Sequence, residues 1–160
     1  MMLAQFRKET APLRLTERAR ALGLTPYQVI IAASLIEKEA GLKREQPLVS
    51  SVIRNRLRDG IPLAIDATIQ YLFIRRDGHP KNPLTTADTR VVSPYNTYRI
   101  AALPPTPIAA PGLAAIEAAL APASTDYLYY RLCDPNRLSL GHVFAHTLQR
   151  RDALYARCRG

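Results

Sequence analysis

The segment from Thr25 to Gly41 limits what this chain can fold into more than any other, because it carries signals for both ends of a helix. Thr25 is followed by Pro26 and Gln28, which together form a capping box with proline at the first helical position. Gly41 provides a C-terminal stop. The segment therefore predicts a helix over residues 26–40, with aliphatic residues at helical spacing along one side.

Prolines and glycines divide the remaining chain into short elements. Apolar periodicity and capping residues predict five further helices. Three of them cover residues 47–58, 112–120 and 147–157, and the second has Leu113, Ile116 and Leu120 on one side. A fourth runs from Asp66, as its N-cap, to residue 73, and a short fifth begins at Thr85 or Thr86. Strands are predicted over 63–65, 127–132 and 142–145, and the last two are expected to pair. Helices with a small antiparallel sheet indicate an α+β fold, and 160 residues suit a single domain.

The chain carries a net charge of +9, from 22 Lys and Arg against 13 Asp and Glu. Such a charge suits nucleic acid, an anionic membrane surface or an anionic polymer such as peptidoglycan, and it equally suits a solvated basic surface. The longest apolar run is too short to span a bilayer, and no signal peptide or anchor is visible. Cys133 and Cys158 match no metal or redox spacing, which leaves free thiols and a disulfide both open.

Glu39 stands out because a helical wheel places it among aliphatic side chains. At about 100° per residue it falls one turn after Leu35 and Ile36, inside the apolar arc, whereas Glu37 falls near the edge of that arc. Desolvation raises the pKa of a carboxyl group, and a general acid that works near neutral pH needs such a shift. Glu39 is therefore a candidate acid, although a frayed helix end would let the same side chain simply reach water.

Several segments occur in an order that resembles one known family. In chain order they are residues 33–39, 52–57, 63–71, 93–98, 103–105, 107–108, 111–112, 127–130 and 141–144. The most specific is Ser93-Pro94-Tyr95-Asn96-Thr97-Tyr98, followed by Leu103-Pro104-Pro105. Together they resemble the catalytic domain of the endolytic murein transglycosylase family, also called YceG-like. The resemblance makes residues 1–15 an N-terminal extension and residues 16–160 the catalytic domain.

The resemblance implies an enzyme that cleaves the β-1,4 bond between N-acetylmuramic acid and N-acetylglucosamine inside peptidoglycan glycan strands. Glu39 matches the family's catalytic glutamate, which acts first as acid and then as base and leaves 1,6-anhydromuramoyl ends, unlike the usual two-carboxylate hydrolases. No metal or cofactor is expected. The implied partners are peptidoglycan strands and cell-wall synthesis proteins, not nucleic acid. The family acts at the extracytoplasmic face of the bacterial cytoplasmic membrane. Its association with the membrane comes from parts that are not expected in this chain.

Six further residues of the matching segments are predicted to contact substrate: Asp66, Thr68, Tyr95, Asn96, Tyr98 and His142. Most of them have an alternative role in the fold. Asn96 could form an Asx-turn, and Tyr95 and Tyr98 could lie in the core. Asp66 could serve only as a helix cap, and His142 could satisfy a local hydrogen bond.

Two other functions stay open at this point. A nucleic-acid-binding module would explain the charge, but the chain has no recognisable helix-turn-helix or basic-aromatic strand pattern. A glycan-binding domain without catalysis is left open by Ala64 and Ala67, where the family usually has Gln and Pro. Further departures are Thr106, where Gly is usual, and Arg151-Asp152, where His-Asn is usual.

Overall fold

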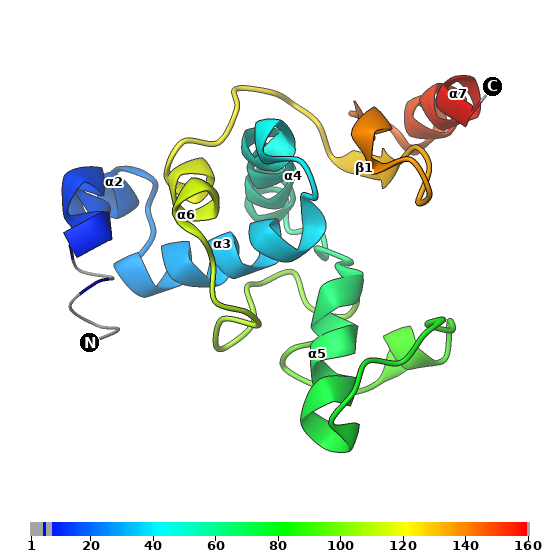
Figure 1. Ribbon diagram of the computed structural model, residues 1–160, viewed down its shortest axis with the longest axis horizontal. Helices are drawn as coiled ribbons and strands as arrows, with labels where there is room; N and C mark the ends of the chain where they lie inside the picture. Colours follow the sequence, from blue (N-terminus) through cyan, green and yellow to red (C-terminus); the bar gives the residue numbers. More distant parts are fainter. Residues whose placement is uncertain (1–4, 6–7, 160) are drawn as a thin grey trace.

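Helix α3 (Pro26–Glu39) crosses the middle of the molecule, and helices from before and after it in the chain pack on it (Figure 1). The computed structural model describes residue 5 and residues 8–159, so part of the expected 1–15 extension lies outside the described residues. The α-helices and strands described are α2 (Leu15–Ala21), α3, α4 (Gln46–Arg58), α5 (Asp66–Asp77), α6 (Leu113–Leu120), β1 (Tyr129–Leu132), β2 (His142–Ala145) and α7 (Leu148–Arg159). Short 3-10 turns cover Ala11–Leu13, Lys43–Glu45, Asp88–Arg90 and Leu138–Leu140. Helices combined with a two-stranded antiparallel sheet confirm the predicted α+β class.

The capping box predicted at the start of α3 is present. The Thr25 hydroxyl accepts a hydrogen bond from the backbone N–H of Gln28 at 3.1 Å, and the Gln28 side chain accepts one from the backbone N–H of Thr25 at 2.8 Å. The helix ends at Glu39, one residue before the predicted end, and Ala40 follows in an extended conformation. Glu39 is therefore the last helical residue of the element that forms the core.

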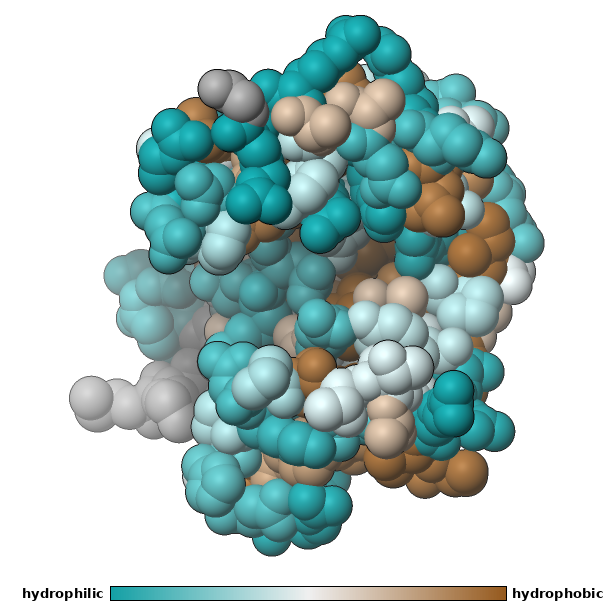
Figure 2. Space-filling view, turned by 90° about the vertical axis from the view of Figure 1, so that its right-hand side faces the viewer, coloured by the Kyte–Doolittle hydropathy of each residue, from teal (hydrophilic) through white to brown (hydrophobic). Residues whose placement is uncertain are grey.

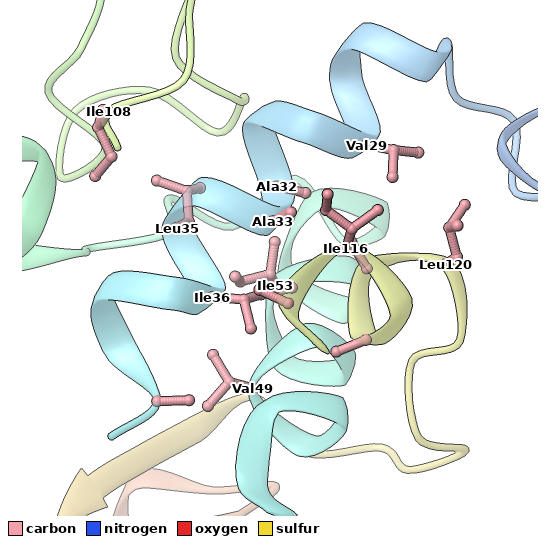
Figure 3. Close-up of a cluster of buried hydrophobic side chains, with 14 of the residues drawn as sticks. Val29, Ala32, Ala33, Leu35, Ile36, Val49, Ile53, Ile108, Ile116 and Leu120 are labelled. Carbon is pink, nitrogen blue, oxygen red and sulfur yellow. The ribbon is translucent and has the colours of Figure 1, made fainter. Parts of the chain in front are cut away.

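The core lies where α3 meets α4 and α6. Figure 3 shows Ala33, Ile36, Ile53 and Ile116 gathered between these three helices. Burial of one such aliphatic side chain stabilises the fold by about 1.5–3 kcal/mol. Ser34, also buried, accepts a hydrogen bond from the backbone N–H of Ile108, which joins the loop before α6 to α3. These contacts fix the position of the C-terminal end of α3.

Several local predictions were wrong. Residues 63–65 form an extended loop rather than a strand, because the backbone N–H groups of Ala64 and Ile65 bind the carbonyl and hydroxyl of Thr97 instead of a neighbouring strand. Asp66 is not a cap: Ile65 occupies the N-cap of α5, and Asp66 is the first helical residue. The helix expected from Thr85 or Thr86 is only the 3-10 turn Asp88–Arg90. On α6, Leu113 is exposed although it was expected on the apolar side.

The C-terminal part is a hairpin followed by a helix. Strand β1 pairs with β2 in the predicted antiparallel arrangement, with Tyr130 opposite Phe144. Helix α7 packs on this hairpin but has no fully buried residue. A disulfide between Cys133 and Cys158 joins the end of β1 to α7, which answers the question that the sequence left open.

Among the described residues, no single helix is both long and apolar enough to cross a membrane. Helices α2 and α3 meet that criterion only when they are taken together, and they are bent by 86° at the break between them.

Candidate active site

Glu39 lies partly buried at the end of α3, against the hairpin. Its Oε2 atom accepts a hydrogen bond of 2.6 Å from the hydroxyl of Tyr130 on β1. Burial raises the pKa of Glu39 above the ordinary value of 4.5, the Tyr130 hydrogen bond acts in the opposite direction, and the negative charge of Asp66 raises it further. The net result is a raised pKa, so Glu39 holds its proton at a higher pH than an exposed glutamate does.

Glu39 lies at the junction of two pockets. One, of about 390 Å³, is lined by Glu39, Arg56, Leu63, Ala64, Asp66, Tyr98, Tyr130 and Arg151. The other, of about 210 Å³, is lined by Lys38, Glu39, Gly41, Leu42, Glu45, Leu132, Leu138 and His142. Figure 2 shows this side of the molecule hollowed between an upper part, where Figure 1 draws β1 and α7, and a lower part, where it draws α5. Glu39 thus lines both pockets.

Asp66 and Tyr98 line the larger pocket together with Tyr130. The Tyr98 hydroxyl donates a hydrogen bond to Oδ1 of Asp66. Burial, followed by this bond to Asp66, raises the pKa of Tyr98 well above its ordinary value, so the hydroxyl remains a donor. Asp66 therefore lies in the same pocket as Glu39, is oriented by Tyr98, and does not serve as a helix cap.

His142 lines the smaller pocket and is held by Glu45. Its Nδ1 atom lies 2.8 Å from Oε2 of Glu45, and its backbone N–H donates to Oε1 at 2.9 Å. Gly141 allows this approach, because a Cβ atom there would lie 1.9 Å from Oε1 of Glu45. Its φ of +69° also favours glycine. The histidine has the local partner that the sequence left open as an alternative, and it still faces the pocket.

Glu37 lies outside both pockets. Its side chain is exposed, and its Oε2 atom accepts a hydrogen bond of 3.1 Å from the backbone N–H of Gly112, the N-cap residue of α6. Glu37 is thus exposed and bound to α6, whereas Glu39 is partly buried and lines both pockets. The helical wheel had placed Glu39 inside the apolar arc and Glu37 near its edge.

Three of the predicted contact residues lie away from the pockets. Asn96 is fully buried: its amide group donates to the carbonyls of Thr89 and Val91 and accepts from the backbone N–H of Tyr98. Thr68 is equally buried and bonds within the fold. The Tyr95 ring packs against another tyrosine, and its hydroxyl bonds to Thr106. These contacts favour the structural role that the sequence left open for Asn96 and Tyr95, and they give Thr68 one as well.

Sequence reasoning missed several residues that line the two pockets: Arg56, Tyr130, Glu45 and Arg151. Arg56 and Tyr130 were inside matching segments, but nothing in those segments separates them from their neighbours. Arg56 holds the hairpin to the loop before α5, because its guanidinium donates to the carbonyls of Leu128, Pro62 and Leu63. Within the described part of the chain, no group of three or more His, Cys, Asp or Glu is arranged to hold a metal ion.

Comparison with known proteins confirms the resemblance. Residues 1–157 match the YceG-like family, and the chain belongs to that family. It is 41% identical over 104 residues to an endolytic murein transglycosylase of Bacillus subtilis (strain 168). The aligned region covers 65% of this chain and 28% of that protein. It is 32% identical over 130 residues to an endolytic murein transglycosylase of Streptococcus pneumoniae serotype 2, which covers 81% of this chain and 23% of that protein.

The fold is also similar to a crystal structure of a yceG-like protein from Listeria monocytogenes. The TM-score is 0.69 at 32% sequence identity, over 95% of this chain and 43% of that one. The chain spans about a quarter of the length of the two curated relatives.

Proposed function

We propose that this chain carries the catalytic centre of a lytic transglycosylase that cleaves peptidoglycan glycan strands, with Glu39 as the single acid and base. The observation that carries the proposal is a carboxyl group of raised pKa, bonded to Tyr130, at the junction of two pockets in a YceG-like chain. The proposed substrate follows from the two relatives, which are endolytic murein transglycosylases, since murein is peptidoglycan.

In the first step, Glu39 donates its proton to the glycosidic oxygen between N-acetylmuramic acid and N-acetylglucosamine, and the bond from that oxygen to C1 of the muramoyl residue breaks. In the second step, the Glu39 carboxylate takes the proton of the muramoyl 6-hydroxyl group, and the oxygen of that hydroxyl group attacks C1. The product is a 1,6-anhydromuramoyl end. Glu39 is again protonated, and no water is consumed.

Asp66 lies in the same pocket and gives the reaction a second carboxylate. In the proposed mechanism Asp66, oriented by Tyr98, stabilises the positive charge that develops near C1. The same position also suits a second candidate, hydrolysis, in which Asp66 would activate water or attack C1. The structure of the product end separates the two.

Tyr98 and His142 are the proposed substrate contacts, one in each pocket. The disulfide between Cys133 and Cys158 supports action outside the cytoplasm, because disulfides persist in oxidising compartments. On this ground and from the proposed substrate, we propose that the protein acts at the extracytoplasmic face of the bacterial cytoplasmic membrane, with cell-wall synthesis proteins as expected partners.

The test is to incubate the chain with purified peptidoglycan and to analyse released glycans by mass spectrometry, with Glu39→Gln as the inactive control. Release of fragments by the wild-type chain alone supports the proposal. Binding without release would leave a glycan-binding domain, and steeply salt-dependent DNA binding without glycan binding would favour the nucleic-acid module.

A further inference from the structure

The larger pocket contains two arginines that come from different elements, Arg56 from α4 and Arg151 from α7. Arg56 uses Nε and Nη1 to bind backbone carbonyls, and its Nη2 atom donates no hydrogen bond within the described part of the chain. No carboxylate of the described residues lies within ion-pair distance of Arg56. Arg56 is thus a half-buried cation in the pocket wall with a free donor.

The positive charge of Arg151 is only weakly compensated by a neighbouring carboxylate. Its Nε and Nη2 atoms both donate to one oxygen of its neighbour Asp152, at 3.0 and 2.6 Å. The Asp152 side chain is 53% exposed, whereas that of Arg151 is 23% exposed, so water screens the pair from the Asp152 side. Burial chiefly, and the charge of Arg151 as well, lower the pKa of Arg56, which still remains charged as arginine does in proteins.

The ionisable groups in this pocket have an excess of positive charge in the acid form of the enzyme. Glu39 is then neutral, Asp66 is bound by Tyr98, and both arginines are charged. Two guanidinium groups can offer paired N–H donors to one planar anion. A muramoyl residue carries such a group beside the scissile bond: its 3-O-lactyl arm ends in a carboxylate in peptide-free strands, and in an amide leading to peptide carboxylates in peptide-bearing strands.

We propose that Arg56 and Arg151 form a subsite for a carboxylate on the lactyl arm of the muramoyl residue. The inference rests on the proposed function for the identity of the strand. The subsite selects strands by charge, and α7 supplies half of it. It also orients the sugar, because the arm is fixed to the ring whose C1 must face Glu39.

The test measures binding rather than turnover, using Glu39→Gln so that no strand is cut. Calorimetry gives the affinity for three preparations of equal length: peptide-free strands, the same strands with their carboxylates converted to amides, and peptide-bearing strands. We expect the charged peptide-free strands to bind about tenfold more tightly than the amidated ones, the scale of a charge-assisted hydrogen bond. Adding Arg151→Gln should abolish this difference, and adding Arg150→Gln, an exposed neighbour on α7, should preserve it.

If only the peptide-bearing strands bind tightly, the bound carboxylate belongs to the peptide, and the subsite formed by the two arginines still stands. Equal affinity for all three preparations, or a charge preference that survives Arg151→Gln, would overturn it. The proposed function fails by a different result, namely that the wild-type chain releases no fragments from any preparation while charge-selective binding persists.

Discussion

Glu37 and Glu39 lie two residues apart on α3 but have different surroundings, which makes them a matched pair for mutation. We expect Glu39→Gln to lower turnover about 100- to 10,000-fold, because the amide keeps the size of the side chain and removes the proton source. Glu37→Gln should keep near wild-type turnover and cost about 0.3–1 kcal/mol of stability, because it removes a negative charge at the N-terminus of α6. Fragment release and thermal unfolding measure the two effects. Equal losses of turnover would contradict the assignment.

Tyr130 contacts the proposed acid, Glu39, through a single hydroxyl group. Its hydrogen bond favours the ionised form of Glu39, so Tyr130→Phe should raise the pKa of Glu39 further. The acid step needs the protonated form, and activity falls as the pH rises through that pKa. The alkaline limb of the profile of kcat/KM against pH should therefore move to higher pH in Tyr130→Phe. Tyr127→Phe, on the same segment, is the control, and an unmoved or acid-shifted limb in Tyr130→Phe would refute the coupling.

Asn96 shows how a specific sequence motif can be structural. All three hydrogen bonds of its side-chain amide join backbone groups of residues 89–98. We expect Asn96→Ala to destabilise the fold by about 1–3 kcal/mol, since it removes the hydrogen bonds of a fully buried amide group and leaves the carbonyls of Thr89 and Val91 without this donor. The kcat of the folded fraction should stay near that of the wild type. Urea unfolding and turnover below the unfolding transition check this, and a loss of kcat without a loss of stability would return Asn96 to the substrate site.

At the scale of elements, α3 could be predicted and the segment before α5 could not, for a physical reason. The capping box joins Thr25 to Gln28, three residues away, so the sequence window contains both partners. The extended segment 63–65 finds its partner in Thr97, more than thirty residues later, and only the folded chain brings them together. Nothing in the sequence indicated the positive φ of Ala64, +53°, because alanine rarely adopts that conformation.

Helix α7 is joined to the hairpin by a covalent bond as well as by packing. It buries no residue fully, and the disulfide closes a loop of 25 residues between β1 and α7. In the chain-entropy description such a loop is worth about 3 kcal/mol. We expect Cys158→Ser to expose the arginines of α7 to trypsin while fragments that contain α3 stay protected. Reducing agent should reproduce this in the wild-type chain and add nothing in the variant. Equal protection of α7 in both proteins would mean that packing alone holds it.

At the scale of the whole molecule, the site combines α3, α4, α5, the hairpin and α7. Glu39 could be singled out because the helical wheel compares it with neighbours in the same helix. Glu45 and His142 could not be paired, because they lie 97 positions apart and neither has a distinctive local pattern. Arg151 was visible only as a departure from the family. Sequence windows find the residue at the centre of this site, and long-range packing supplies the walls.

The two pockets on either side of Glu39 lead to a prediction about the products. A strand that fills both pockets continues past the acid in both directions, so cutting should occur inside strands. Early products should therefore be long fragments of mixed size. Their new muramoyl ends should be 1,6-anhydro, because the 6-hydroxyl belongs to the same sugar as C1 and reacts at a high effective concentration. Chromatography of early time points, followed by mass spectrometry, measures both properties.

Asp66 makes the chemistry of these ends a stringent test, since a second carboxylate in the pocket is what a hydrolase would need. Anhydro ends are lighter than reducing ends by one water. If Asp66 only stabilises developing charge, Asp66→Asn should slow the reaction and leave every new end anhydro. Predominantly reducing muramic acid ends from the wild-type chain would instead make Asp66 the second catalytic group and the protein a hydrolase. Early release of disaccharides alone would show cutting from strand termini, because cutting from an end removes one disaccharide at a time, and would refute internal cleavage.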